Sequence, residues 1–410
     1  MRSFFKVKTA EDIFESLRDI KSLEAESVTI TVALSRILAR DVISSEDLPG
    51  FQRSTMDGYA LAAKDSFGAS ENLPTPLNIV GEVRVGEIPR FGLHRGECAR
   101  ISTGGMLPKG ADAVVMVEYS QMVEDGIVEI SRPVSPLENV ILPDDDVKRR
   151  QVVLHKGTLL RPQDLGILAG LGISVVDVFS KPRAAIISTG EEIVDISQKP
   201  RVGQMRDINS YTLGGLCIKS GVEPLYLGIV RDRFEDLKLF IEKGISQADV
   251  VLLSGGSSVG VKDFTLDAFL SLDGVKILAH GVSISPGKPT IIARKGNKTL
   301  WGLPGHPVSA MVIFDVFLRY LFGRLSGLSN LTEYNGHAIE AELDRNIESA
   351  TGREDYIRVK LTHMEGKWLA TPILGKSGLI STMVEADGII KIGMNNEGLY
   401  KGEMVKVRLF

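Results

Sequence analysis

Residues 248–265 read ADVVLLSGGSSVGVKDFT, and this stretch decides the fold. Its first six residues are apolar with one exception, which predicts a buried strand. Small residues follow from Ser254 to Gly260, and they let backbone N–H groups approach a phosphate or another oxyanion closely. Lys262 and Asp263 come next, one a cation and the other able to hold a metal. The stretch therefore predicts a strand, an anion-cradling turn and a charged pair just before a helix.

Strand-like and helix-like runs alternate around this stretch, from about Lys181 onward. In chain order the runs are RAAIISTGEE, YTLGGLCIKSG, EPLYLGIVRD, RFEDLKLFIEKG and ADVVLLSGG. A strand at Thr299–Gly302 and a helix from Ala310 close the series. Such a βαβ alternation predicts an α/β domain built on a doubly wound, mainly parallel sheet.

Two β-rich segments accompany the α/β series. From Phe51 to about Pro136 short strands such as LNIVGEVRV and GECARIS alternate with Gly and Pro turns, which predicts an inserted β-rich domain. After Gly327 the runs HAIEAEL, YIRVKL, WLATPIL and EMVKVRLF predict a C-terminal β-barrel-like domain. Near the start of the chain we expect a helix through Ile37 and Leu38. The fold class is therefore α/β plus β domains in a multidomain chain.

Composition excludes several classes of protein. With 410 residues, 43% of them apolar and 24% charged, the chain is an ordinary globular protein of several domains. The net charge of −4 predicts no nucleic-acid partner. The opening MRSFFKVKTAED lacks a signal-peptide core, and the apolar run 308–322 is interrupted by charges and too short to span, so we expect no membrane segment. Two separated cysteines, Cys98 and Cys217, fit a reducing cytoplasm.

Four turns predict where the chemistry lies, because ligands of doubly wound sheets bind beyond the carboxyl ends of the strands. They are the turns at residues 188–192, 231–232, 254–263 and 303–309. We expect Glu192, Asp232 and Asp263 to converge there and hold a divalent cation, with Mg²⁺ preferred. A second anion element is the turn SPGKP, in which Lys288 supplies a point charge. The candidate ligand-binding residues in the turns are Ser188, Thr189, Gly190, Ser254, Gly255, Gly256, Ser257 and Gly260.

Simpler interpretations stand beside these. A strand followed by a glycine-rich turn is more often ordinary α/β connectivity than a phosphate site. Lys262 is equally well a surface charge at a helix start, and His306, between Gly and Pro, fits turn packing better than catalysis. Nothing in the sequence supports Ser188 or Ser254 as a nucleophile. Only the coincidence of several such turns favours a site.

The turns and the β-insert together resemble a known family. The motifs, in order, are STMDGYA from Ser54, RISTGGMLPKGADAVVMVE from Arg100, STGEE, SGGSSVGVKDFT, PGKP and LPGHPVSA. The chain resembles the MoeA family of molybdopterin molybdenumtransferases, which is related to the E domain of gephyrin. The resemblance covers nearly the whole chain, and the ordered set of motifs is far more specific than any one of them.

The resemblance implies four domains and a homodimer. The domains are an elongated one from residues 1–50 and 141–180, the β-rich insert 51–140, the molybdopterin-binding α/β domain 181–327 and the C-terminal β domain 328–410. The active site is shared, because it lies between the α/β domain of one subunit and the β-insert of the other. Asp57 and Thr103 would then reach the site from the partner subunit.

The implied reaction inserts molybdate into adenylylated molybdopterin, and the phosphoanhydride is cleaved to release AMP. The resemblance assigns catalysis to Asp263, Asp57, Thr103 and Lys288, and the metal to Glu192, Asp232 and Asp263. It further implies that Pro304 and Pro307 shape a turn and that Arg353 and Ser381 help to hold molybdate. A molybdopterin adenylyltransferase is the expected upstream partner.

Three departures from the family pattern leave alternatives open. Ser285 stands where Lys is common, Ile141 where Arg is common, and His306 gives PGHP in place of PGNP. The alternatives are a molybdopterin adenylyltransferase and a cofactor-binding or scaffold protein without turnover. The sequence does not separate molybdate from tungstate.

Overall fold

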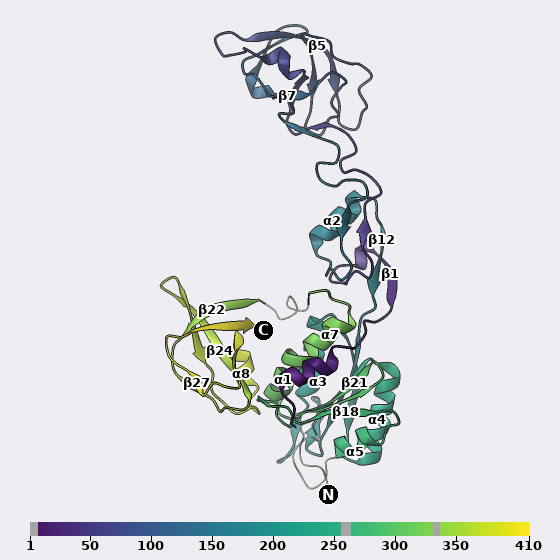
Figure 1. Cartoon of the computed structure of the whole chain (residues 1–410), viewed down its shortest axis with the longest axis vertical. Helices are drawn as coiled ribbons and strands as arrows, with labels where there is room; N and C mark the ends of the chain where they lie inside the picture. Colours follow the sequence, from purple (N-terminus) through teal and green to yellow (C-terminus); the bar gives the residue numbers. More distant parts are fainter. Residues whose placement is uncertain (1–6, 256–263, 331–336) are drawn as a thin grey trace. The chain divides into compact units, whose positions relative to one another are not determined.

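The computed structural model describes residues 7–255, 264–330 and 337–410 and divides into two compact units (Figure 1). The first unit comprises Met1–Arg40, Lys156–Arg161 and Val175–Phe410. The second comprises Asp41–His155 and Pro162–Ser174. We describe each unit by itself. No helix in the described part of the chain combines the length and apolar character needed to cross a bilayer.

The second unit is built on the β-rich insert. Its six-stranded sheet has the order β7-β4-β6-β5-β9-β8. The strands are β4 (Gly58–Leu61), β5 (Thr75–Val83), β6 (Glu97–Ile101), β7 (Ala113–Met116), β8 (Ser120–Glu124) and β9 (Ile127–Ile130). The unit also contains the ladders β2 (Val42–Ile43) with β11 (Val152–Leu154) and β3 (Arg53–Ser54) with β10 (Val140–Ile141), and the helix α2 (Pro162–Gly170). The strands expected from the alternating pattern in this segment are confirmed.

The first unit contains the α/β sheet, of order β16-β13-β17-β21-β20-β18. The strands are β13 (Arg183–Thr189), β16 (Glu223–Val230), β17 (Val250–Ser254), β18 (Lys276–His280), β20 (Ile291–Lys295) and β21 (Lys298–Leu303). The four strands β16, β13, β17 and β21 run parallel, and β20 and β18 each pair antiparallel with their neighbours. The prediction of a mainly parallel sheet is confirmed.

Helices cover both faces of this sheet, as a doubly wound fold requires. Val250 and Leu252 of β17 pack on one side, while Val251 and Leu253 pack on the other, because side chains alternate along a strand. The first face is covered by α1 (Ala10–Leu17), α3 (Asn209–Lys219), α6 (Pro307–Ile313) and α7 (Arg319–Leu325). The second is covered by α4 (Phe234–Gln247) and α5 (Phe264–Leu270).

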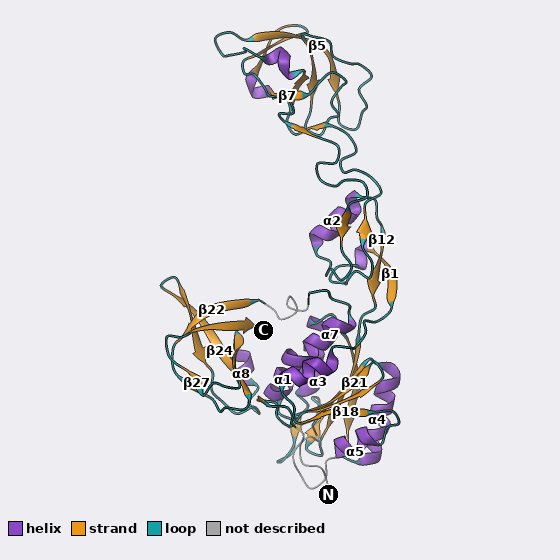
Figure 2. Cartoon of the chain, in the orientation of Figure 1, coloured by secondary structure: helices purple, strands orange, loops and turns teal. Residues whose placement is uncertain are grey.

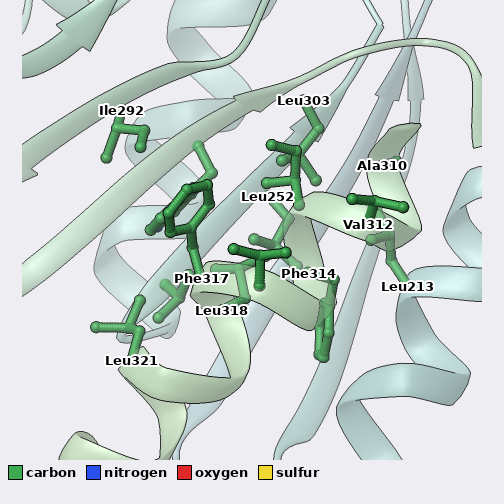
Figure 3. Packing of buried hydrophobic residues seen from close by; sticks show 14 of the residues in the cluster. Leu213, Leu252, Ile292, Leu303, Ala310, Val312, Phe314, Phe317, Leu318 and Leu321 are labelled. Carbon is green, nitrogen blue, oxygen red and sulfur yellow. The ribbon is translucent and has the colours of Figure 1, made fainter. Parts of the chain in front are cut away.

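The apolar run 308–322 forms a buried helical segment. It spans α6, a π-helical turn at Phe314–Leu318 and α7, and its side chains fill the core (Figure 3). Phe317 and Leu318 are fully buried there. The two charges that interrupt the run, Asp315 and Arg319, form an ion pair of 2.8 Å between Oδ1 and Nε, with both side chains nearly buried.

The C-terminal strands close into a barrel. Pairing runs from β24 (Glu354–Met364) through β25 (Lys367–Pro372), β22 (Ala338–Leu343), β28 (Met404–Leu409) and β26 (Gly388–Ile392) and back to β24. A short ladder of β23 (Ile347–Glu348) with β27 (Gly398–Leu399) and the helix α8 (Ser381–Glu385) complete it. Strands dominate this part of the chain (Figure 2). The β-barrel-like expectation is therefore confirmed.

The helix expected through Ile37 and Leu38 is wrong. Ile37 bridges to Leu159, and Leu38 bridges to Val178 of β12 (Val175–Phe179), which itself pairs with β1 (Ala25–Thr29). Ser35 has φ of 60°, which a right-handed helix cannot contain. Ile37 and Leu38 therefore lie in extended backbone that bridges to other segments, and they do not form one face of a helix.

Candidate functional site at the carboxyl edge of the α/β sheet

The predicted turns meet at one edge because the parallel strands end in register. Thr189 pairs with Val230, Ser188 with Ser254, and Ser254 with Leu303. The turns that follow these strands are therefore neighbours. The antiparallel strand β20 starts at the same edge, since Ile291 pairs with Gly302, so the preceding turn that carries Lys288 also lies there.

Gly255 is required where β17 ends. Its φ is +105°, and a Cβ at this position would lie 2.0 Å from the carbonyl oxygen of Thr189. Its N–H donates to the carbonyl oxygen of Leu303 (3.2 Å), and its Cα would lie 3.7 Å from a Cβ on Gly305. An amino acid with a side chain at this position would keep the backbones of these turns further apart. Gly255 therefore places backbone without a side chain at the start of the turn that the sequence predicted to cradle an anion.

Asn209, at the start of α3, ties two of the turns together. Its Nδ2 donates to Ser254 Oγ (2.5 Å) and to the carbonyl oxygen of Gly305 (2.9 Å). The residue is 7% exposed. Sequence analysis missed it, because its partners lie far along the chain. The only local signal was the polar side chains of Asp207, Asn209 and Ser210, interrupted by Ile208, directly before an apolar helical pattern.

A second polar contact links β13 to the same helix. Ser188 and Ser210 share a hydrogen bond of 2.9 Å between their hydroxyls, and both residues are buried. Asp207 accepts from the backbone N–H of Ser210 at 3.1 Å. Ser188 therefore has a structural partner, and within the described part of the chain its hydroxyl bonds to another hydroxyl and not to a general base, in agreement with the sequence.

The carboxylates expected to hold a metal are only partly placed. Glu192 is exposed and folds back on Gly190, whose added Cβ would lie 2.9 Å from Glu192 Oε2. Asp232 is half-buried in the neighbouring turn after β16. Among the described residues no group of three or more His, Cys, Asp or Glu side chains comes together to hold a metal ion. The candidates Gly256, Ser257, Gly260 and Asp263, and also Lys262, lie outside the described residues.

The turn that carries Lys288 is held by its backbone. Lys288 is exposed, while its carbonyl oxygen accepts from Val282 N–H at 2.9 Å. Thr290 Oγ1 donates to the carbonyl oxygen of Gly287 at 2.6 Å. Gly287 has φ of +133°, and a Cβ there would meet the Ile313 side chain at 2.8 Å. The turn is thus fixed by its backbone, and the exposed Lys288 side chain extends from it.

The barrel adds side chains beside this edge through two contacts. In the first, β19 (Ile284–Ser285) pairs with β24, Ser285 opposite Asp355. In the second, His306 Nδ1 and Ser377 Oγ lie 2.8 Å apart. His306 is also the N-cap residue of α6, whose first residue is Pro307. Pro307 and the preceding Pro304 are both buried. The predicted turn-packing role of His306 agrees with both contacts.

Arg353 and Ser381 sit differently on the barrel. Arg353 Nε lies 3.1 Å from Asp355 Oδ1, and the same carboxylate accepts from Ser349 Oγ at 2.6 Å. Asp355 is 3% exposed, so the guanidinium balances a buried charge. The Arg353 side chain remains 45% exposed and keeps further N–H donors. Ser381 starts α8 and is exposed.

Asp57 and Thr103 lie together in the second unit. The backbone N–H and the hydroxyl of Thr103 both donate to Asp57 Oδ1, at 2.6 and 3.1 Å. The backbone hydrogen bond, followed by the hydroxyl bond, lowers the pKa of Asp57. Gly58 is forced by packing, since its Cβ would lie 1.9 Å from the carbonyl oxygen of Val115. Two residues far apart in sequence thus form one exposed anionic pair. Ile141 of β10, one of the departures noted in the sequence, pairs with Arg53 of β3.

Comparisons with known proteins agree along the whole chain. Family models match residues 5–172 (MoeA N-terminal region, domains I and II), 185–323 (probable molybdopterin binding domain) and 340–410 (MoeA C-terminal region, domain IV). A putative molybdopterin biosynthesis protein of Methanocaldococcus jannaschii is 36% identical over 100% of this chain and 99% of that protein. The molybdopterin molybdenumtransferase of Bacillus subtilis is 31% identical over 95% of this chain and 90% of that protein. A crystal structure of a MoeA molybdopterin biosynthesis protein of Pyrococcus horikoshii, 32% identical, superposes with a TM-score of 0.86 and covers 99% of this chain and 100% of that one. The chain therefore belongs to the MoeA family, the molybdopterin molybdenumtransferases.

Proposed function

We propose that this chain inserts molybdate into adenylylated molybdopterin, cleaving the phosphoanhydride and releasing AMP. The observation that carries the proposal is the alignment of glycine-rich turns at one edge of the α/β sheet, closed by Gly255 against Thr189. Membership of the MoeA family along the whole chain supports the same reaction.

The reaction requires two anions, a molybdate and a phosphoanhydride, to be held close together. Backbone N–H groups at the turns and the exposed ammonium of Lys288 offset their repulsion, since fixed dipoles and charges need no reorganisation. The N–H donors of Arg353 that do not bind Asp355 would help to offset the same repulsion from the barrel. Molybdenum then exchanges oxygen ligands for the two dithiolene sulfurs, while one phosphoanhydride P–O bond is hydrolysed to give AMP and the pterin phosphate.

A divalent cation suits the described carboxylates. Mg²⁺ is commonly held by one or two carboxylates together with substrate phosphates, and Glu192 and Asp232 lie in adjacent turns. We propose that these two, with Asp263 from the following turn, hold Mg²⁺, which when bound would supply charge neutralisation at the phosphoanhydride. Glu192 and Asp232 would orient the bridging phosphates by fixing the position of the cation that the phosphates bind.

We propose a homodimer in which Asp57 and Thr103 complete the site of the partner subunit. The support is chemical: an exposed carboxylate held at low pKa by Thr103 stays ionised and fixed, which suits orientation of a cation or a water. A molybdopterin adenylyltransferase is the proposed upstream partner, because the substrate must arrive adenylylated. The buried cysteines Cys98 and Cys217 support a cytoplasmic location.

We also propose the division into four domains, residues 1–50 with 141–180, 51–140, 181–327 and 328–410. Two of the joints, near residues 180 and 327, are supported by family models that end at 172 and 323 and begin at 185 and 340.

The test is AMP release from adenylylated molybdopterin, with and without molybdate, and with Mg²⁺ or a chelator. Wild type is compared with Gly255→Val, whose side chain would collide with Thr189 O. The matched control is Gly296→Ala, also at positive φ (+61°) but with nothing within 4 Å of the new Cβ. We expect molybdate-stimulated AMP release in wild type and control and its loss in Gly255→Val. Wild type that releases pyrophosphate from ATP would instead be an adenylyltransferase, and wild type that binds the substrate without releasing AMP would be a binding protein. A tungstate arm decides between the two oxyanions.

A further inference from the structure

The start of α3 holds a buried acceptor that none of the chemistry above uses. Asn209 spends both N–H groups on Ser254 Oγ and Gly305 O. Because Gly305 O can only accept, the Nδ2 end of the amide must face it, which fixes the opposite direction of Oδ1. Among the residues that the structure describes, Oδ1 has no hydrogen-bond donor, although the residue is 7% exposed.

A second buried polar atom without a partner lies on the neighbouring strand end. Thr189 is 2% exposed, and its Oγ1 also has no partner within the described part of the chain. The backbone of Thr189 touches the Gly255 position, and Gly255 follows Ser254, which Asn209 binds. Side chains alternate along β13, however, so Ser188 faces α3 and Thr189 faces the opposite side of the sheet. Asn209 Oδ1 is therefore the atom that points to a ligand, because leaving a buried polar group unpaired is costly.

We propose that Asn209 Oδ1 accepts a hydrogen bond from an N–H or O–H group of the bound substrate. An amide oxygen cannot bind a phosphate or molybdate oxygen, because both are acceptors. The groups of the proposed substrate that can donate to it are an N–H of the pterin and a hydroxyl or amino group of the adenylate. Asn209 thus has two roles, one in tying the turns through Nδ2 and one in recognition through Oδ1. This inference rests on the proposed function.

Three ligands separate the two roles. AMP and unadenylylated molybdopterin each carry one of the possible donor groups, whereas inorganic pyrophosphate, fully ionised at high pH, carries none and reports only on the anion-binding turns. Binding of each is measured by calorimetry to wild type, Asn209→Ala and the control Thr212→Ala. Thr212 lies on the same helix, where its hydroxyl donates to the carbonyl oxygen of Asn209 at 3.2 Å.

We expect Asn209→Ala to weaken binding of AMP or of molybdopterin about tenfold, as for loss of one hydrogen bond in a buried site, and to leave pyrophosphate within about twofold. Whichever of the two organic ligands responds identifies the donor. Equal weakening of all three ligands would reduce Asn209 to a structural tie and overturn the inference. Unchanged binding of all three would overturn it as well. Wild type that binds none of them contradicts the proposed function instead.

An isosteric variant covers the case in which Asn209→Ala does not fold. Asn209→Asp keeps an acceptor toward the substrate but places a carboxylate oxygen against Gly305 O. We expect its AMP or molybdopterin affinity to recover as the pH falls, because a protonated carboxyl again donates to Gly305 O. A pH profile parallel to that of wild type would contradict the assignment.

Discussion

Neutralising Asp315 should destabilise the first unit more than any single surface charge. Asp315 lies in the π-helical turn between α6 and α7 and is 4% exposed. It pairs with Arg319 one turn later and with Arg408, which comes from strand β28 of the barrel. The same carboxylate therefore joins the core helix to the C-terminal barrel. Asp315→Asn would leave both guanidinium groups without a counter-charge.

The size of the effect follows from the exposure of the partners. Loss of one partner of a buried ion pair costs about 3–5 kcal/mol. The Arg408 side chain is 23% exposed and can turn toward water, whereas the Arg319 side chain is only 10% exposed and cannot. We therefore expect about 3 kcal/mol for Asp315→Asn. Arg408→Met should cost less, since Arg319 still balances the carboxylate.

The chain supplies its own probe for this measurement. Trp301 is fully buried in the α/β core and stacks on Phe317 with a centroid distance of 6.3 Å. Trp368, the other tryptophan, is 39% exposed on the barrel, so Trp368→Phe leaves Trp301 as the sole reporter. Urea unfolding followed by its fluorescence should show a midpoint about 1 M lower in Asp315→Asn.

A surface pair provides the control. Glu15 and Arg18 lie 2.9 Å apart, but their side chains are 63% and 71% exposed. Glu15→Gln should therefore change the free energy of unfolding by less than about 0.5 kcal/mol. If Asp315→Asn shifts the midpoint no more than Glu15→Gln does, the reasoning about the buried carboxylate is refuted.

Three further predictions concern the site and the thiols. Mixing inactive Asp57→Asn subunits with inactive Gly255→Val subunits should restore about a quarter of wild-type AMP release, because each mixed dimer regains one intact shared site; no recovery would mean that the site lies within one subunit. Hydrogen bonds from Thr103 lower the pKa of Asp57 because they favour its ionised carboxylate. Their contribution to the stability of the fold is fully present above the ordinary pKa of 3.8 and is lost as the pH falls through the lowered pKa. In a carboxyl NMR titration, the pKa of Asp57 should lie below 3.8 in wild type and closer to 3.8 in Thr103→Val, which lacks the hydroxyl donor. A wild-type pKa at or above 3.8 would contradict this prediction. Burial raises the pKa of both Cys98 and Cys217 to about 12, so a thiol reagent at pH about 8 should label them only after unfolding, and fast labelling of the native protein would refute that.

Local patterns predicted the scaffold of the site well. The apolar run before Ser254 reads as a buried strand, and the parallel register then places its turn beside those after Ser188 and after Leu303. The start of α1 depends on near neighbours too, since Thr9 and Asp12, three residues apart, exchange hydrogen bonds at 3.1 Å. These features depend on neighbours in sequence or on a regular sheet.

Features that depend on distant partners could not be predicted in the same way. Asn209 reaches Ser254 and Gly305, which lie 45 and 96 residues away, so no local pattern reports their contact. Ile37 and Leu38 look helical until the bridges to other segments are known. The expected metal site stays a prediction, because Asp263 lies outside the described residues.

The most direct test of the central claim is to count AMP and molybdenum in one sample. Wild type, adenylylated molybdopterin, Mg²⁺ and molybdate are incubated together, and released AMP and pterin-bound molybdenum are quantified. The account predicts equal amounts, one AMP for each molybdenum inserted. AMP release without insertion of molybdenum, or insertion without AMP, would contradict it.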